Sequence, residues 1–202
     1  MPEKNELTAV ILAGGKSSRM KQDKGLIVLY GKMMIEHVIE KVKEITCNII
    51  IITKNPTYRR FGYPCFSDIY PDAGPLGGIY TGLVHSATEK NLVVGCDTPF
   101  LSVAVLNALK NKSLDEDVLV TVQQGKAEPL FAIYDRKCIP HFKERIKKRK
   151  LKIIDAIQEL KTGIMNIDKE KWITKNEFAN INTPEELNKY ILLKTKPVDN
   201  EQ

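Results

Sequence analysis

The sequence predicts a single-domain α/β fold in which helices cover both faces of a mostly parallel, mixed β-sheet. Short apolar segments typical of buried strands alternate with segments whose apolar residues recur at helical spacing. Strand candidates lie closer together in the second half, which indicates some antiparallel pairing. With 202 residues, the chain is long enough to bury one full hydrophobic core.

The first half of the chain alternates between strand and helix candidates. Residues 8–12 and 48–53 are short apolar runs, the second with four consecutive isoleucines, so we expect buried strands. Between them, apolar side chains from Met34 to Ile45 recur at helical spacing. The remaining candidates here are strands over residues 64–68 and 91–97, and a glycine-rich connection over 74–82 that leads into a helix.

In the second half, Ser102 is the expected N-cap of a helix. Residues 118–122 and 130–134 flank Gly125, so they are expected to pair as a hairpin or lie as neighbours. A basic helix is expected from about Cys138. The later candidates are a helix over residues 155–160, an extended segment over 164–167 and a short strand over 178–182.

A capping signal opens the last predicted helix. Thr183 is the expected N-cap, Pro184 occupies the first helical position, and Glu186 completes a capping box. The residues after this helix are polar. We therefore expect one domain over residues 1–195 and a disordered tail over residues 196–202.

Composition excludes several classes of protein. The chain is 43% hydrophobic and 28% charged, and no apolar run approaches the roughly 20 residues that span a bilayer. The first residues show no secretion signal, so we expect a cytoplasmic protein with no membrane contact. The cysteines form no Cys-x-x-Cys pair and match no zinc-site spacing, which indicates reduced thiols. They are Cys47, Cys65, Cys96 and Cys138.

The net charge of +6 suits an anionic partner without identifying one. The densest basic run, residues 147–150, is typical of a solvated helix end. Aromatic residues do not interleave with it, so we expect no nucleic-acid binding. The histidines lie away from predicted strand ends and are expected to have packing or solvent-facing roles. They are His37, His85 and His141.

A glycine-rich turn follows the first predicted strand. Adjacent glycines in residues 12–15 let the backbone turn tightly and present N–H groups to an anion. Arg19 and Lys24 add positive charge within reach of phosphates. The spacing fits neither a Walker A loop nor Gly-x-Gly-x-x-Gly. Alone, the two glycines fit an ordinary turn equally well; with Arg19 and Lys24, they favour phosphate binding.

Two further segments also follow strand candidates. Glycines in residues 72–79 permit close approach of a base or ribose, and Asp68, just upstream, can accept hydrogen bonds from guanine or ribose hydroxyls. Asp97 directly follows an apolar strand, and such a carboxylate can hold Mg²⁺ together with phosphate oxygens and water. Ligands of parallel sheets collect at the carboxyl ends of strands, which is where all three segments are expected.

Taken together, these segments resemble the molybdenum cofactor guanylyltransferase family, often called MobA. The first motif is shared with sugar-nucleotide and terpenoid-precursor nucleotidyltransferases, but the C-terminal Asn-x-Asn-Thr-Pro element narrows the match to the molybdopterin branch. The matching residues run in order over nearly the whole chain. They are Leu12 to Gly15, Arg19 and Met20, Lys24, Gly74 to Gly78, Asp97 to Pro99, and Asn180 to Leu187.

The resemblance implies a Rossmann-like three-layer sandwich of the nucleotide-diphospho-sugar transferase type, with residues 1–195 as the nucleotidyltransferase domain. It also implies Mg²⁺-dependent transfer of GMP from GTP to the terminal phosphate of molybdopterin, with release of pyrophosphate. The implied catalytic residues are Arg19, Lys24 and Asp97. The implied GTP contacts are Leu12, Ala13, Gly14, Gly15, Lys24, Asp68 and Asp97, with Mg²⁺ on Asp97 and the acceptor facing Asn180 and Asn182.

The implied partners are GTP and molybdopterin, Mo-bound or metal-free, and the resemblance allows transient contacts with other cofactor-biosynthesis or molybdoenzyme-maturation proteins. One residue departs from the family pattern, because Lys21 stands where the family usually has glycine after Arg-Met. Two alternatives remain open. One is a related CTP-dependent enzyme acting on a pterin or sugar-alcohol phosphate, and the other is a non-catalytic nucleotide-binding module.

Overall fold

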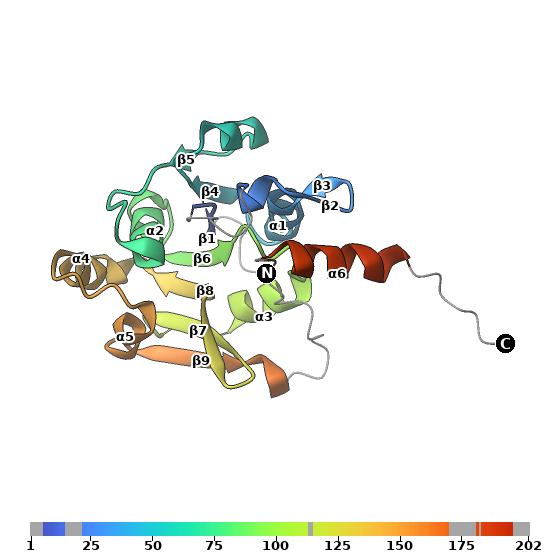
Figure 1. Cartoon of the computed structure of the whole chain (residues 1–202). Coiled ribbons are helices and arrows are strands. Elements are labelled where there is room, and N and C mark those ends of the chain that lie inside the picture. Colours follow the sequence, from blue (N-terminus) through green and yellow to red (C-terminus); the bar gives the residue numbers. More distant parts are fainter. Residues whose placement is uncertain (1–5, 15–21, 113–114, 170–180, 182, 196–202) are drawn as a thin grey trace.

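The computed structural model describes residues 6–14, 22–112, 115–169, 181 and 183–195. In this part of the chain, a seven-stranded sheet lies between two layers of helices (Figure 1). Each face of the sheet carries its own cluster of buried apolar side chains. The predicted α/β three-layer sandwich is confirmed. The predicted strand over 178–182, except Ile181, and the predicted tail lie outside the described residues.

The seven strands of the sheet have the order β5-β4-β1-β6-β8-β7-β9. Every pairing among the described strands of this sheet is parallel except those of β8, which is antiparallel to β6 and β7. The carboxyl ends of the parallel strands therefore meet at one edge. The strand bounds are β1 Leu7–Leu12, β4 Asn48–Ile52, β5 Cys65–Phe66, β6 Lys90–Gly95, β7 Val118–Gln123, β8 Lys126–Asp135 and β9 Thr162–Asn166, and a separate hairpin is formed by β2 Val28–Leu29 and β3 Lys32–Met33.

Helices cover both faces of the sheet. The α-helices are α1 Met34–Val42, α2 Gly74–His85, α3 Val103–Asn111, α4 Ile139–Lys147, α5 Ile153–Gln158 and α6 Pro184–Thr195. The short 3-10 helices are η1 Lys24–Leu26, η2 Pro56–Phe61, η3 Arg136–Cys138 and η4 Ile167–Lys169. In Figure 1, α1 and α3 lie on one side of the sheet and α2, α4 and α5 on the other. No described helix combines the length and apolar character that crossing a membrane requires.

The glycine-rich segment over residues 74–82 was wrongly predicted as a connection, because α2 begins at Gly74 and contains all of it. The low helix propensity of glycine is outweighed here by close packing. A Cβ atom on Gly82 would collide with the Val10 side chain, and one on Gly77 would lie 2.7 Å from the Tyr70 carbonyl oxygen. The glycines let α2 approach β1 and the preceding loop more closely than side chains would allow.

The expected hairpin between the later strands is confirmed as β7 and β8. Its two turn residues, Gln124 and Gly125, have φ values of 50° and 72°. Positive φ at both central positions defines the type I′ turn, whose twist matches that of the strands it joins. The pairing register shifts between Val120 and Thr121, which marks a bulge in the ladder.

Both predicted helix caps are confirmed. The Ser102 side chain accepts a hydrogen bond from the Val105 N–H at 3.3 Å at the start of α3. At the start of α6, the Glu186 N–H donates to the Thr183 hydroxyl oxygen and the Thr183 N–H donates to the Glu186 carboxylate, each at 3.2 Å. The reciprocal bonds form a capping box that fixes where the last helix begins.

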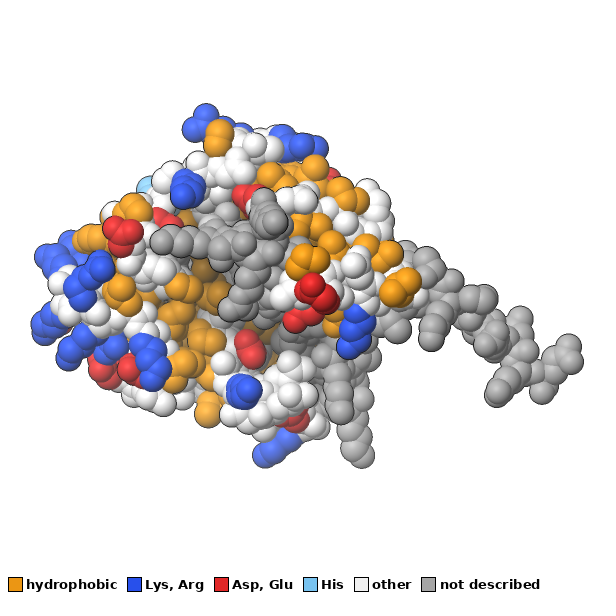
Figure 2. Space-filling view, viewed as in Figure 1, with side chains coloured by type: hydrophobic (Ala, Val, Ile, Leu, Met, Phe, Trp, Pro, Cys, Tyr) orange, Lys and Arg blue, Asp and Glu red, His pale blue; other side chains and the backbone are white. Residues whose placement is uncertain are grey.

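The basic run over residues 147–150 is exposed at the C-terminal end of α4, where Figure 2 shows Lys and Arg side chains gathered. The Arg149 N–H donates to the Ile146 carbonyl at 3.0 Å, and the Lys150 N–H donates to the Arg145 carbonyl at 2.9 Å. These bonds form a Schellman motif. Arg149 has a φ of 56° at the position that glycine usually occupies in this motif.

We expect Arg149→Gly to raise the free energy of unfolding by roughly 0.5–1 kcal/mol. Left-handed backbone costs a residue with a Cβ roughly 1–2 kcal/mol, and glycine's greater freedom in the unfolded chain offsets part of this gain. The measurement is the urea midpoint of unfolding. Arg149→Ala is the control, since it removes the same charge but keeps the strained backbone. Equal midpoints for both variants would show that charge, and not strain, sets the effect.

Candidate active site

Three parallel strands end side by side at the carboxyl edge of the sheet. Leu12, the last residue of β1, pairs with Ile52 of β4 and with Gly95 of β6. The Ala13 N–H donates to the Ile52 carbonyl at 2.9 Å, and the Cys96 N–H donates to the Leu12 carbonyl at 3.1 Å. The turn after β1 is thereby fixed between its two neighbours, with Gly14 exposed beyond them.

Lys24 and Asp97, predicted separately from the sequence, lie in contact at this edge. The Lys24 ammonium is 3.3 Å from Asp97 Oδ2, and the two side chains are 24% and 22% exposed. Such a partly exposed pair adds little to stability. The contact places the Lys24 ammonium and the Asp97 carboxylate together just after the end of β6, where a ligand of the sheet is expected to bind.

Gly95 explains how the Asp97 carboxylate is accommodated. A Cβ atom on Gly95 would lie only 2.6 Å from Asp97 Oδ1, so the carboxylate folds back over the end of β6. The Thr98 hydroxyl donates to the Gly95 carbonyl at 2.8 Å and holds the same turn closed. The glycine at position 95 thus leaves the space that this carboxylate occupies.

Asp68 lies next to Leu12, the last residue of β1. A Cβ atom on Gly78 would lie 3.3 Å from a Leu12 methyl group and 3.6 Å from Asp68 Oδ1, so the three residues are neighbours. Asp68 Oδ1 is buried and has no hydrogen-bond partner among the described residues. Burial raises the pKa of the Asp68 carboxyl. A buried acceptor without a partner is costly to folding and suits a hydrogen-bond donor on a ligand.

We expect Asp68→Asn to stabilise the protein and weaken nucleotide binding. A folded-state pKa above the usual 3.8 means that the ionised carboxyl destabilises the fold at neutral pH. The rise in melting temperature should be largest near pH 7 and should disappear as the pH falls below 3.8, where both states bind the proton. Asp72→Asn, an exposed carboxyl in the same connection, is the control. A lower melting temperature for Asp68→Asn at pH 7 would contradict this account.

The predicted acceptor residues Asn180 and Asn182 lie outside the described residues, as do Gly15, Arg19 and Lys21. Ile181 is described: it is fully buried, and its N–H donates to the Asp97 carbonyl at 3.1 Å. Ile181, which stands between the two predicted acceptor residues in the sequence, therefore contacts the backbone of Asp97.

The structure adds three residues that the sequence did not single out for the site. The Asp23 carboxylate accepts hydrogen bonds from the Tyr58 hydroxyl and from the Asn55 side-chain amide. Asn55 precedes a proline, which is a turn and capping signal, but no spacing rule links it to Asp23. The three histidines make other contacts: His37 bonds to the Leu29 carbonyl, His85 stacks on Phe66, and His141 bonds to the Ala156 carbonyl.

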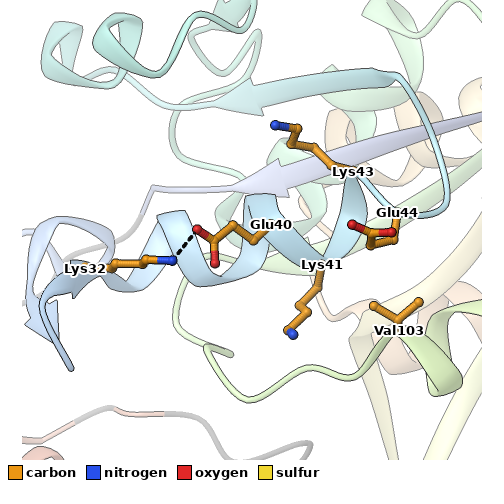
Figure 3. Close-up of a pocket in the computed structure, with 6 residues that line it drawn as sticks. All are labelled: Lys32, Glu40, Lys41, Lys43, Glu44 and Val103. Atoms are coloured by element: carbon orange, nitrogen blue, oxygen red, sulfur yellow. Dashed lines mark hydrogen bonds and ion pairs between the residues drawn. The ribbon is translucent and has the colours of Figure 1, made fainter.

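Two surface hollows of the described residues lie away from Lys24, Asp68 and Asp97. One of about 550 Å³ lies on α1 and is lined mainly by charged side chains; the residues drawn in Figure 3 are Lys32, Glu40, Lys41, Lys43, Glu44 and Val103. A smaller hollow of about 160 Å³ lies between the loop before α2 and the end of α4, and includes Tyr70 and Arg149. Among the described residues, no group of three or more His, Cys, Asp or Glu could hold a metal ion.

Comparison with known proteins gives the class of this protein. Residues 9–162 match the family model described as a MobA-like NTP transferase domain. A protein of Flavobacterium johnsoniae named "Probable molybdenum cofactor guanylyltransferase" is 40% identical, covering 90% of this chain and 95% of the relative. A Vibrio campbellii protein named molybdenum cofactor guanylyltransferase is 37% identical, covering 93% and 96%. The sequence and fold together define a nucleotidyltransferase.

A solved structure agrees with this fold. The molybdopterin-guanine dinucleotide biosynthesis protein A of Archaeoglobus fulgidus aligns with a TM-score of 0.80 at 24% identity, over 94% of this chain and 100% of that one. The chain belongs to the MobA-like NTP transferase family, as its sequence motifs predicted.

Proposed function

We propose that this chain transfers GMP from GTP to the terminal phosphate of molybdopterin. An oxygen of the acceptor phosphate attacks the α-phosphorus, the bond between the α-phosphorus and the bridging oxygen breaks, and pyrophosphate leaves. The product is the guanine dinucleotide form of the cofactor. The names of the relatives support the choice of substrates. The observation that carries the proposal is the contact between Lys24 and Asp97 beside the turn after β1.

The residues have separate proposed roles. The acceptor phosphate is ionised at neutral pH and needs no strong general base, so catalysis rests on positioning and charge neutralisation. Lys24 holds the phosphates, and the buried Asp68 oxygen accepts a hydrogen bond from the base or ribose. The turn residues bring backbone N–H groups to the nucleotide. In this proposal, Leu12, Ala13, Gly14, Gly15 and Arg19 complete the GTP site, and Asn180 and Asn182 face the acceptor.

Asp97 is the proposed ligand of Mg²⁺. Magnesium typically binds one or two carboxylates together with substrate phosphates and water, and a partly exposed carboxylate at a strand end fits that donor set. When bound, the ion would polarise the α-phosphate and stabilise the departing pyrophosphate. The carboxylate itself is held in place by its fit over Gly95 and by the bonded turn after β6.

A cytoplasmic location is part of the same proposal, together with transient contacts with other proteins of cofactor biosynthesis or molybdoenzyme maturation. All four cysteines are thiols that form no disulfide bond. Reducing compartments keep thiols in this form.

The direct test supplies the purified protein with Mg²⁺, molybdopterin and either GTP or CTP. Pyrophosphate release and formation of the guanine dinucleotide with GTP, and little with CTP, are the expected results. Turnover with CTP in place of GTP would indicate the related enzyme instead. GTP binding with no pyrophosphate release, with acceptor present, would indicate a non-catalytic module and overturn the proposal.

A further inference from the structure

A three-residue cluster joins the turn that carries Lys24 to the segment that follows β4. Both oxygens of the Asp23 carboxylate are engaged: Oδ1 accepts from the Tyr58 hydroxyl, and Oδ2 accepts from Asn55 Nδ2 at 2.9 Å. Tyr58 lies in η2, and Asn55 is the N-cap of that helix. More than thirty residues of sequence separate the two halves of this cluster, so only the fold brings them together.

Asp23 is the N-cap residue of η1, yet its side chain makes no capping bond to that helix. Aspartate at an N-cap usually accepts a bond from its own helix. Here the carboxylate turns away and bonds to η2 instead. Two backbone bonds close the turn itself, from the Leu26 N–H to the Asp23 carbonyl and from the Ile27 N–H to the Lys24 carbonyl, each at 3.1 Å.

Packing fixes the same turn from a second direction. Tyr58 is fully buried, and a Cβ atom on Gly25 would overlap its hydroxyl oxygen. The same Cβ would lie 3.1 Å from the Cys96 sulfur. Gly25 therefore sits closely between Tyr58 and Cys96. Because Cys96 directly precedes Asp97, this contact sets Lys24 and Asp97 at a fixed spacing.

We propose that Asp23, Asn55 and Tyr58 form a clamp that positions Lys24 for the triphosphate. The clamp residues are positioning residues that act through Lys24 and do not touch the substrate. This inference rests on the proposed role of Lys24 as a phosphate ligand.

In the clamp, Tyr58 and Asn55 donate hydrogen bonds and the Asp23 carboxylate accepts them. Burial raises the pKa of the Tyr58 hydroxyl well above its usual value, so it remains a donor at all working pH values. Asn55 Oδ1 accepts from the Thr57 N–H at 3.0 Å, which leaves Nδ2 to face Asp23. The donor and acceptor roles in the bond between Asn55 and Asp23 are therefore fixed, and mutation can exchange them.

The first experiment exchanges the carboxylate and the amide. Asp23→Asn leaves a single acceptor oxygen for two donors, the Tyr58 hydroxyl and Asn55 Nδ2, and Asn55→Asp places two carboxylates opposite each other. Either change should lower the affinity for GTP about tenfold, the scale of one hydrogen bond to a charged group, while affinity for guanosine changes little. The double variant restores one donor and one acceptor, so it should recover most of the affinity for GTP. A double variant that binds GTP as weakly as the worse single variant would overturn the clamp.

The second experiment needs no nucleotide, so its result is separate from the test of the proposed function. Hydrogen exchange of the Leu26 and Ile27 amides should become faster in Tyr58→Phe. Tyr134→Phe is the matched control, because Tyr134 is another fully buried tyrosine whose hydroxyl donates a bond, to the Pro129 carbonyl at 2.8 Å. Exchange of those two amides that is unchanged in Tyr58→Phe, or faster by the same factor in both variants, would refute the positioning role.

Discussion

Asp97→Asn is expected to lose at least about a hundredfold in kcat/KM while keeping its fold. The amide preserves the shape of the side chain but removes the charge proposed to hold Mg²⁺. A bound metal lowers such a barrier by several kcal/mol, and each 1.36 kcal/mol corresponds to a factor of ten in rate. The Asp97 carboxylate is 22% exposed, and its pair with Lys24 contributes little to stability. Pyrophosphate release and melting temperature are measured on the same preparation.

Asp117→Asn is the matched control for this prediction. Asp117 is 21% exposed and forms an ion pair with Lys137 at 2.9 Å, but it precedes β7 at the opposite edge of the sheet. The Lys137 partner lowers the pKa of the Asp117 carboxyl, so this charge stabilises the fold above the usual pKa, and the stabilisation is lost on acidification. The control should melt lower at pH 7 and keep its turnover. Near-normal turnover of Asp97→Asn would show that Asp97 is not the ligand of Mg²⁺.

The sheet was predictable because its strands have a strong local signal. β1, β4 and β6 each contain a short apolar run, with four consecutive isoleucines in β4, and both faces of these runs are buried, so tertiary packing and local propensity agree. The parallel order then places Leu12, Asp68 and Asp97 at one edge, as the rule for such sheets requires. The C-terminal capping box was equally local, since all its bonds fall within four residues.

The first part of α2 was predicted as a connection because the interactions that make it helical are not local. Glycine is a poor helix former, and a stretch with Gly74, Gly77, Gly78 and Gly82 predicts a loop. The benefit appears only when β1 is in place, since Val10 leaves no room for a Cβ atom on Gly82. Read from the sequence, the same glycines suggested ligand approach, and Gly78 does lie beside Asp68.

The sequence also did not reveal which residues support the site. Asp23 directly precedes Lys24, but its partners Asn55 and Tyr58 are in a different element with no periodic relation to it. Hydrogen bonds between distant segments leave no regular spacing in a single sequence, whereas strands and helices do. The roles of the predicted GTP and acceptor residues therefore remain predictions that mutation must test.

The second large effect is expected at Lys24. Lys24→Ala should weaken binding of GTP about tenfold to a hundredfold, because a hydrogen bond to a charged group contributes roughly 1.5–3 kcal/mol. Binding of guanosine should change little, since the ammonium lies beside Asp97 at the end of β6, whereas Asp68, the proposed base or ribose contact, follows β5. Titration calorimetry with GTP, GDP and guanosine measures the three affinities.

Two further variants separate charge from local structure at this position. Lys32→Ala removes an exposed lysine paired with Glu40 at 2.6 Å, so it tests whether losing any one positive charge weakens GTP. Lys24→Arg keeps the charge on a longer, planar group and should retain part of the affinity for GTP. Gly25, the residue after Lys24, packs closely against Tyr58 and Cys96. If Lys24→Ala weakens guanosine as much as GTP, the lysine acts through the shape of the turn, and the phosphates must be held by other residues.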